Sequence, residues 1–221
     1  MTDPLILAFD TSAAHCAAAL LSGDSVIDAK VEEMGRGQAE RLMPMLEEML
    51  ARSGRGWPDL DAIGVGIGPG NFTGIRISVA AARGLALGLK IPAVGVTGFE
   101  AGGYAKGTTP LWVAIEAPRG QVYLQRRGGG KDHAPELRPA SDTEVLDARL
   151  LWLSDMAADK MAANIARIAR DRRGSPVPRP APPYLRPADA APMRAPPPLL
   201  LPCPMPPTRP RPSTRPPSPR P

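Results

Sequence analysis

The sequence predicts an α/β fold in which helices cover a mixed sheet, and three observations support this prediction. Near the N-terminus, apolar runs of about five to eight residues are separated by turn residues. Between residues 60 and 90, a buried strand, a glycine-rich turn and a helix follow one another. Strand and helix patterns then alternate to residue 125, which favours helices packed on a sheet.

The N-terminal part is expected to contain three strands and a helix. The strands cover residues 5–10, 14–21 and 26–31, separated by turn residues. The helix covers residues 38–53, because its apolar residues recur at intervals of three and four and Gly54 can end it. Its apolar positions are Leu42, Met45, Leu46, Met49 and Leu50.

The middle of the chain is expected to continue the alternation. A buried strand at 60–67 leads into a glycine-rich turn at 68–74, and a helix follows at 75–90. The later elements are a strand at 92–96, a short helix near 97–104, strands at 111–115 and 121–125, unpatterned residues from 128 to about 141, and a final helix at 147–170.

Proline divides the chain into two compositions. Residues 175–221 hold 20 of the 29 prolines, seven arginines and one acidic residue, so we expect an extended, polyproline-like tail. The net charge of +5 comes from this tail, and the rest of the chain is close to neutral. The basic balance therefore does not predict a folded surface for nucleic acid.

Cysteine content and hydropathy predict a cytoplasmic protein. Cys16 and Cys203 form neither a disulfide framework nor a pair with metal-ligand spacing. Asp3 stands where a signal peptide would be basic, and the longest apolar region, 74–97, contains three basic residues. We expect no membrane segment.

The glycine-rich turn has two interpretations. Glycines before a helix allow backbone N–H groups to approach a phosphate. However, the turn lacks the lysine of the Walker pattern, and Thr73 occupies the position of the third glycine in G-x-G-x-x-G. The alternative is a tight turn whose glycines let the helix pack closely on the sheet.

No residue is identified as catalytic or as a metal ligand. His15 and His133 have no His, Cys or acidic residue at a convincing ligand spacing. Ser12 and Ser78 lack a nucleophile elbow, and Cys16 has no basic neighbour besides His15. We therefore expect no metal and no cofactor bound by this chain on its own.

The helix at 75–90 is apolar over most of its circumference. Its basic residues recur every seven positions and form one narrow stripe, Arg76, Arg83 and Lys90. A row of small residues runs beside them, Ala80, Gly84 and Gly88, and each interior glycine costs about 1 kcal/mol relative to alanine. Either the helix at 38–53 covers this helix within the chain, or both helices present a surface to a partner protein.

Four segments resemble the TsaB family, whose members are partner subunits in the bacterial synthesis of N6-threonylcarbamoyladenosine in tRNA. The segments are LILAFDTS at 5–12, QAERL at 38–42, GPGNFTGIR at 68–76 and PYLRP at 183–187. Three features depart from the family pattern: Asn71 replaces a serine, EAPRGQ at 116–121 replaces the usual DARRGE, and the chain is short between residues 125 and 150.

The resemblance implies an actin-like, sugar-kinase-like ATPase fold of the ribonuclease H-like class. An N-terminal lobe would cover 1–105 and a shortened second lobe 106–174, followed by the tail at 175–221. It also implies a non-catalytic scaffold subunit that binds and supports a TsaD-like catalytic subunit, beside a TsaE-like ATPase. In this interpretation tRNA is reached only through the complex.

The resemblance and the patterns together give expected contacts. The partner surface would use the helices at 38–53 and 75–90, ATP or ADP would lie at the subunit junction, and a homodimer is an alternative assembly. The expected partner contacts are Leu42, Met45, Leu46, Met49, Arg76, Ala80, Arg83 and Gly84. The expected nucleotide contacts are Asp10, Thr11, Ser12, Gly68, Gly70 and Thr73.

Other functions stay open at this point. A phosphotransferase or ATPase of the actin-like superfamily would use Asp10, Thr11 and the glycine-rich turn. A peptidase would need a metal or a nucleophile that the sequence does not offer. The tail arginines could bind tRNA phosphates, although no aromatic residue follows Tyr184.

Overall fold

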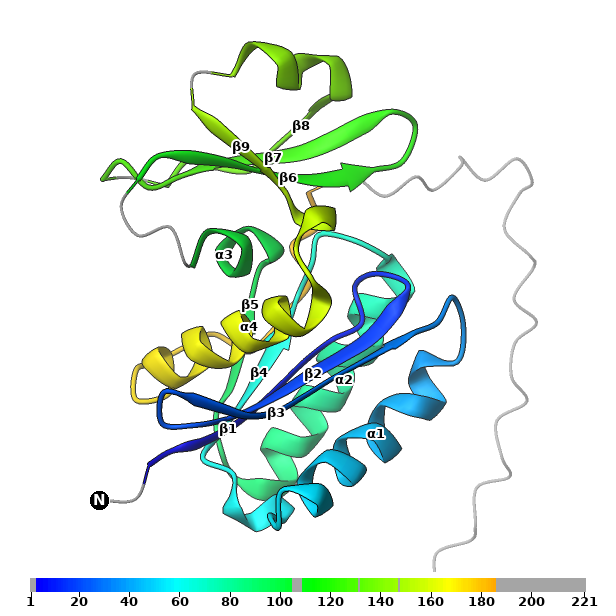
Figure 1. Ribbon diagram of the computed structural model, residues 1–221, viewed down its shortest axis with the longest axis vertical. Helices are drawn as coiled ribbons and strands as arrows, with labels where there is room; N and C mark the ends of the chain where they lie inside the picture. The colour runs from blue at the N-terminus through cyan, green and yellow to red at the C-terminus, as the bar shows by residue number, and fades with distance from the viewer. Residues whose placement is uncertain (1–2, 105–108, 131, 147, 186–221) are drawn as a thin grey trace, which may run out of the picture. The chain divides into compact units, whose positions relative to one another are not determined.

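The computed structural model describes residues 3–104, 109–130, 132–146 and 148–185, which form two mixed sheets with helices (Figure 1). The first sheet has the strand order β3-β2-β1-β4-β5, and the second has the order β8-β7-β6-β9. The first order, in which three antiparallel strands are followed by two parallel ones, is the ribonuclease H-like arrangement of actin-like ATPases. The predicted α/β fold class is confirmed.

The first sheet is built around a strand that is buried on both faces. β1 (Leu5–Asp10) pairs antiparallel with β2 (His15–Ser22), which pairs antiparallel with β3 (Ser25–Glu33). β4 (Ala62–Gly66) lies parallel to β1, and β5 (Ala93–Val96) lies parallel to β4. Every residue of β1 is buried, as expected for a strand that is covered on both sides.

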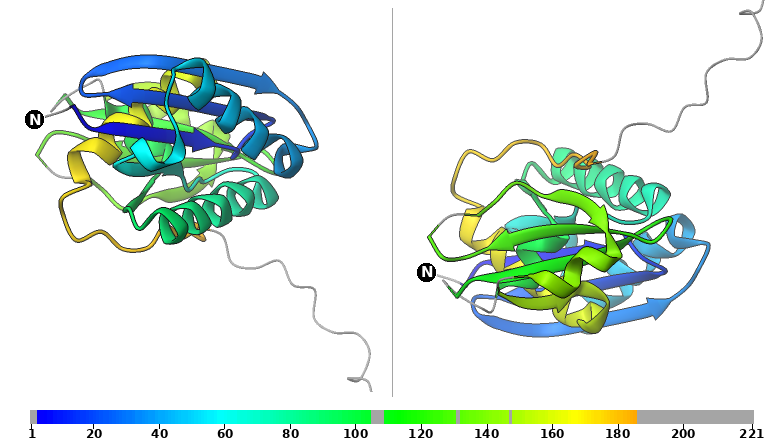
Figure 2. Two further views of the ribbon diagram at one scale, coloured as in Figure 1. Left: turned by 90° about the horizontal axis from the view of Figure 1, so that it is seen from below. Right: turned by 90° about the horizontal axis from the view of Figure 1, so that it is seen from above.

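Three helices cover the first sheet. α1 (Gln38–Arg52) and α2 (Phe72–Leu89) pack on one face, and a short 3-10 turn (Trp57–Asp59) connects α1 to β4. α4 (Ala158–Arg172) packs on the opposite face, against β1, β2 and β4. Figure 2 shows α2 at the edge of this arrangement, with one side turned away from both sheets.

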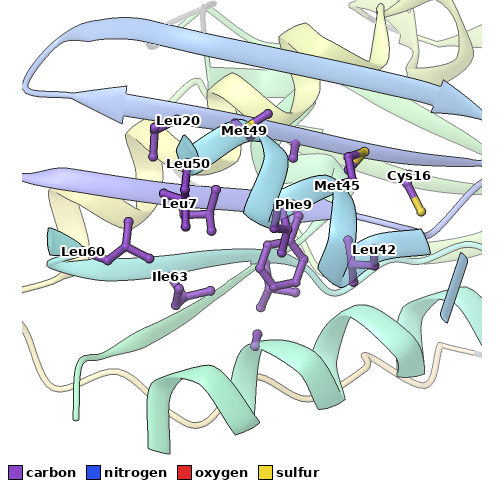
Figure 3. Packing of buried hydrophobic residues seen from close by; sticks show 14 of the residues in the cluster. Leu7, Phe9, Cys16, Leu20, Leu42, Met45, Met49, Leu50, Leu60 and Ile63 are labelled. Carbon is purple, nitrogen blue, oxygen red and sulfur yellow. The ribbon is translucent and has the colours of Figure 1, made fainter. Parts of the chain in front are cut away.

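The apolar side of α1 lies in the core of this chain (Figure 3). Four of its side chains are at most 1% exposed and share a cluster with Phe9 and Leu20. These four are Leu42, Met45, Leu46 and Met49. The expectation that they contact a partner is wrong, because the sheet of their own chain already buries them.

The second sheet is a hairpin with one further strand on each side. β6 (Leu111–Ala117) and β7 (Gln121–Arg127) pair antiparallel. β8 (Glu136–Pro139) pairs antiparallel with β7, and β9 (Arg149–Trp152) pairs parallel with β6. The two hairpin strands agree with the prediction, whereas β8 and β9 were not predicted.

Two stretches therefore differ from the expected elements. β8 and a 3-10 helix (Ala140–Val145) lie within or next to the residues expected to have no pattern. The helix expected at 147–170 begins only at Ala158, since β9 and a 3-10 turn (Leu153–Asp155) precede it. Leu150 and Leu151 belong to β9, whereas Met156 packs in the apolar cluster beneath α4.

α3 (Gly98–Gly103) and α4 link the two sheets. Phe99 of α3 packs in the apolar core of the second sheet. Asn164 of α4 donates a 2.8 Å hydrogen bond from its side chain to the carbonyl oxygen of Ala101. Although α4 falls in the range 106–174 expected for the second lobe, its apolar residues pack on the first sheet.

Part of the expected tail lies on the folded body as a C-terminal segment, residues 175–185. Val177 packs in the apolar cluster beneath α4, and the buried Pro180 lies next to Gly95 of β5. Leu185 packs in the core of the second sheet. Residues 186–221 lie outside the described residues, and so does the expectation that they bind tRNA.

The opposite orientations of α1 and α2 side chains predict opposite mutational effects. Leu46→Ala should lower the free energy of unfolding by about 2 to 5 kcal/mol, because it leaves a cavity in the core. Leu87→Ala should change it by less than about 0.5 kcal/mol, because Leu87 is 80% exposed. Urea unfolding of both variants checks this, and similar losses would contradict the assignment of faces.

Candidate functional site

The glycine-rich turn places the start of α2 beside the end of β1. Asn71 caps the helix, and its side-chain oxygen accepts hydrogen bonds from the backbone N–H groups of Thr73 (3.0 Å) and Gly74 (3.1 Å). The N–H of Asn71 donates to the carbonyl oxygen of Ser12 at 2.6 Å. These N–H groups are therefore already satisfied within the protein.

The two glycines on either side of Asn71 allow a very close approach between segments. A Cβ atom on Gly70 would overlap the carbonyl oxygen of Ser12, and one on Gly74 would overlap that of Thr11. The hydroxyl of Thr11 donates a 2.6 Å hydrogen bond to the carbonyl oxygen of Gly74. The backbone after β1 thus occupies the space against the turn, which favours the packing interpretation over a phosphate cradle.

The residues expected to contact a nucleotide lie in this one region. Asp10, Thr11 and Ser12 are buried, whereas Thr73 is exposed. The carbonyl oxygen of Gly68 accepts a hydrogen bond from Gly98 at 2.9 Å. The structure therefore brings these residues together, but several of their polar groups already bind other groups of this chain.

Asp10 is the centre of a buried polar cluster and is 1% exposed. Its Oδ2 accepts hydrogen bonds from the Ser12 N–H (3.0 Å) and hydroxyl (2.8 Å), and lies 3.1 Å from His15 Nε2. Its Oδ1 has no hydrogen-bond partner among the described residues and lies against Gly66. The hydrogen bond to Asp10 raises the pKa of His15, and burial opposes the shift only in part.

The hydrogen bonds of this cluster are not arranged as in a hydrolase triad. In such a triad the histidine lies between the serine and the acid, so that it can take the serine proton. Here the carboxylate of Asp10 lies between Ser12 and His15. Burial raises the pKa of the Cys16 thiol to about 11, so this thiol is protonated at neutral pH.

A cleft of about 800 Å³ opens beside this cluster. Ser12, His15 and Pro69 line one side, and Glu116 and Tyr123 of the second sheet line another. Across the described ranges, no group of three or more His, Cys, Asp or Glu side chains is arranged to hold a metal ion. The cleft offers a binding volume without an activated nucleophile in its walls.

The second candidate site is the outer face of α2, which no other described element covers. Its residues are Thr73, Arg76, Ala80, Arg83, Gly84, Leu87 and Gly88, all of them exposed. A Cβ atom on Gly84 or Gly88 would meet nothing within 4 Å. Four expected partner contacts therefore share one exposed face: Arg76, Ala80, Arg83 and Gly84.

An aromatic group at the start of α2 extends this face and was missed from the sequence. Phe72 is 54% exposed and Tyr184 64% exposed, and their ring centroids are 6.2 Å apart. The guanidinium carbon of Arg76 lies 3.6 Å from the ring centroid of Phe72. Phe72 and Tyr184 are far apart in the chain, so only the fold brings them together.

α2 is also, among the described residues, the one helix whose length and mean hydropathy (1.3) would allow it to cross a membrane. Helices in the core of a folded domain pass the same test. Ile75, Val79 and Ala82 pack on the first sheet, so the inner side of α2 is part of the α/β core. Its outer side carries small and apolar residues beside two arginines.

Comparisons with known proteins agree with the motifs. A family described as "TsaD: tRNA N6-adenosine threonylcarbamoyltransferase" matches residues 31–190. The chain is 36% identical over 156 residues to the tRNA threonylcarbamoyladenosine biosynthesis protein TsaB of Escherichia coli, covering 67% of each chain. It is 34% identical over 132 residues to TsaB of Haemophilus influenzae, covering 57% of this chain and 55% of that protein.

Two solved structures from Pseudomonas aeruginosa share the fold. One is YeaZ, with a TM-score of 0.62, 25% identity, and coverage of 76% of this chain and 93% of that one. The other is an uncharacterized protein with similarity to peptidase YeaZ, with a TM-score of 0.66, 25% identity, and coverage of 83% and 100%. These matches confirm the family resemblance that the motifs indicated.

The contact between His15 and Asp10 predicts a pH dependence of stability. Because the folded-state pKa of His15 is raised above 6.5, its stabilising contribution is complete below about pH 6.5 and is lost as the pH rises through the folded pKa. His15→Gln should remove this part of the dependence. Urea midpoints measured from about pH 5.5 to 9 check it, and parallel curves for the variant and the wild type would contradict it.

Proposed function

This chain belongs to the TsaB family, and we propose that it acts in tRNA threonylcarbamoyladenosine biosynthesis as a non-catalytic subunit that binds a TsaD-type protein. The names of its relatives in Escherichia coli and Haemophilus influenzae support the biosynthetic role. The match to the TsaD family supports a partner of the same kind of fold.

The observation that carries the scaffold role is the outer face of α2. Gly84 lies in the interior of α2, where a glycine costs about 1 kcal/mol relative to alanine, and Gly88 lies one residue before the helix ends. Nothing in the described part of this chain approaches Gly84 or Gly88 closely enough to require a missing side chain. A partner helix that packs closely against the row formed by Ala80, Gly84 and Gly88 would explain why these residues are small.

The buried cluster around Asp10 supports a role without chemistry of its own. Its serine and histidine both bind the carboxylate, and the backbone after β1 fills the space against the glycine-rich turn. The transfer step is therefore assigned to the TsaD-type partner. ATP or ADP at the subunit junction, a TsaE-type ATPase, a cytoplasmic location and contact with tRNA through the complex belong to this same proposal.

One measurement distinguishes the scaffold role from the alternative, a nucleotide-dependent phosphotransferase. Calorimetry of the purified chain with ATP and magnesium should give no heat of binding, because the N–H groups of Asn71, Thr73 and Gly74 already have partners. Micromolar binding with turnover in the absence of other proteins would favour the alternative.

Enlarging the small residues of α2 should separate binding from folding. Ala80→Leu with Gly84→Leu should weaken binding to the TsaD-type protein by at least about 100-fold, because leucine side chains hold the two helices apart. The unfolding midpoint should stay equal or rise, since leucine is a better helix former and both positions are open.

Isothermal titration with the partner and thermal unfolding of the chain alone check this pair of outcomes. Lys160→Leu is the matched control, because Lys160 is an exposed residue of α4 on the opposite face of the first sheet. Undiminished binding by the double variant would contradict the proposed surface. A wild-type chain that does not bind the partner would contradict the proposed function.

A further inference from the structure

A hollow of about 410 Å³ lies at the C-terminal end of α2, where the helix meets the C-terminal segment. We call it the α2 end pocket. Arg83 and Leu87 of α2 line it together with Ile91, which follows the helix. The C-terminal segment supplies Val177, Arg179 and Pro180.

The floor of the α2 end pocket is apolar and fixed. Ile91 packs on the core beneath α1 and α2, and Val177 packs in the cluster beneath α4. Pro180 is buried beside Gly95 of β5. The apolar clusters on both faces of the first sheet therefore hold the walls of the pocket in place.

The rim of the pocket is cationic. Arg83 and Arg179 are both exposed, and within the described ranges neither forms an ion pair and no Asp or Glu lines the pocket. Elsewhere on the same body, arginines are paired with acids, as Arg41 is with Glu32 at 2.6 Å. Among the described residues, the two guanidinium groups beside the apolar floor thus have no counter-charge.

We propose that the α2 end pocket receives a segment of the TsaD-type partner that carries a carboxylate next to an apolar side chain. Arg83 and Arg179 would bind the carboxylate, and Leu87, Ile91 and Val177 would bury the apolar group. The proposal rests on the proposed function, since Arg83 and Leu87 also belong to the outer face of α2. A carboxylate and an apolar side chain of the partner would thus bind at one end of that face.

The positive charge of the pocket favours this occupant over a second copy of the chain. In a symmetric dimer built on the outer face of α2, the pocket of one copy would face α2 of the other copy. α2 itself contains no acidic residue that could compensate. The apolar floor also separates a protein segment from RNA, whose phosphates would use the arginines but not the floor.

The test is the affinity of the full chain for the TsaD-type protein, measured at several salt concentrations between about 0.05 and 0.5 M. Arg83→Glu with Arg179→Glu should raise Kd at least about 10-fold at low salt and flatten its salt dependence. Leu87→Ser should raise Kd with the salt dependence unchanged, because it removes only apolar contact. Lys160→Glu, on the opposite face of the sheet, is the charge control and should leave Kd unchanged.

Each other outcome overturns the pocket assignment. Loss of binding with Ala80→Leu and Gly84→Leu, but an unchanged Kd with the arginine reversals, would leave the proposed function intact and remove the pocket. If the reversals weaken self-association in sedimentation, or tRNA binding by the isolated chain, while Kd for the partner stays the same, the occupant is a second copy or RNA. Failure of the wild-type chain to bind the partner removes both proposals.

Discussion

The position of α2 depends on the contact between the glycine-rich turn and the end of β1. At Gly74 the carbonyl oxygen of Thr11 fills the space that a side chain would need, and the Thr11 hydroxyl binds back to Gly74. This contact fixes the first turn of α2 against the sheet. The side chain of Asn71 binds the N–H groups of Thr73 and Gly74 that a phosphate would require. A turn that resembles a nucleotide-binding loop in composition therefore acts as a joint between a strand and a helix.

The exposed face of α2 is continued by a segment from the far end of the chain. α1 turns its apolar side inward, so its contribution to stability is internal. α2 packs on the sheet along one side and remains open along the other, with Phe72 and Tyr184 at its start. The two sides of α2 thus differ, because one packs on the sheet and the other carries the exposed Arg76 and Arg83.

The sequence predicted those features that depend on local pattern. The strands near the N-terminus and the amphipathic α1 follow from apolar periodicity, and the small residues of α2 share one side because they recur every four positions. Periodicity does not say which surface buries an apolar face, so the assignment of Leu42 and Met45 to a partner was wrong. β8 and β9 have four residues each and half-buried side chains, which leaves no pattern to detect. The contacts of Tyr184 and Arg179 with the region of α2 depend on the whole fold.

The position of α4 in the chain has a consequence for synthesis on the ribosome. The five strands of the first sheet are complete at Val96, yet the helix that covers their second face ends at Arg172, after the whole of the second sheet. Until that helix emerges, Ile6, Ala8 and Leu21 present an uncovered apolar surface to chaperones and to other nascent chains. The second face of the first sheet can thus be covered only late in synthesis. An interruption of translation before residue 158 would leave a fragment prone to aggregation.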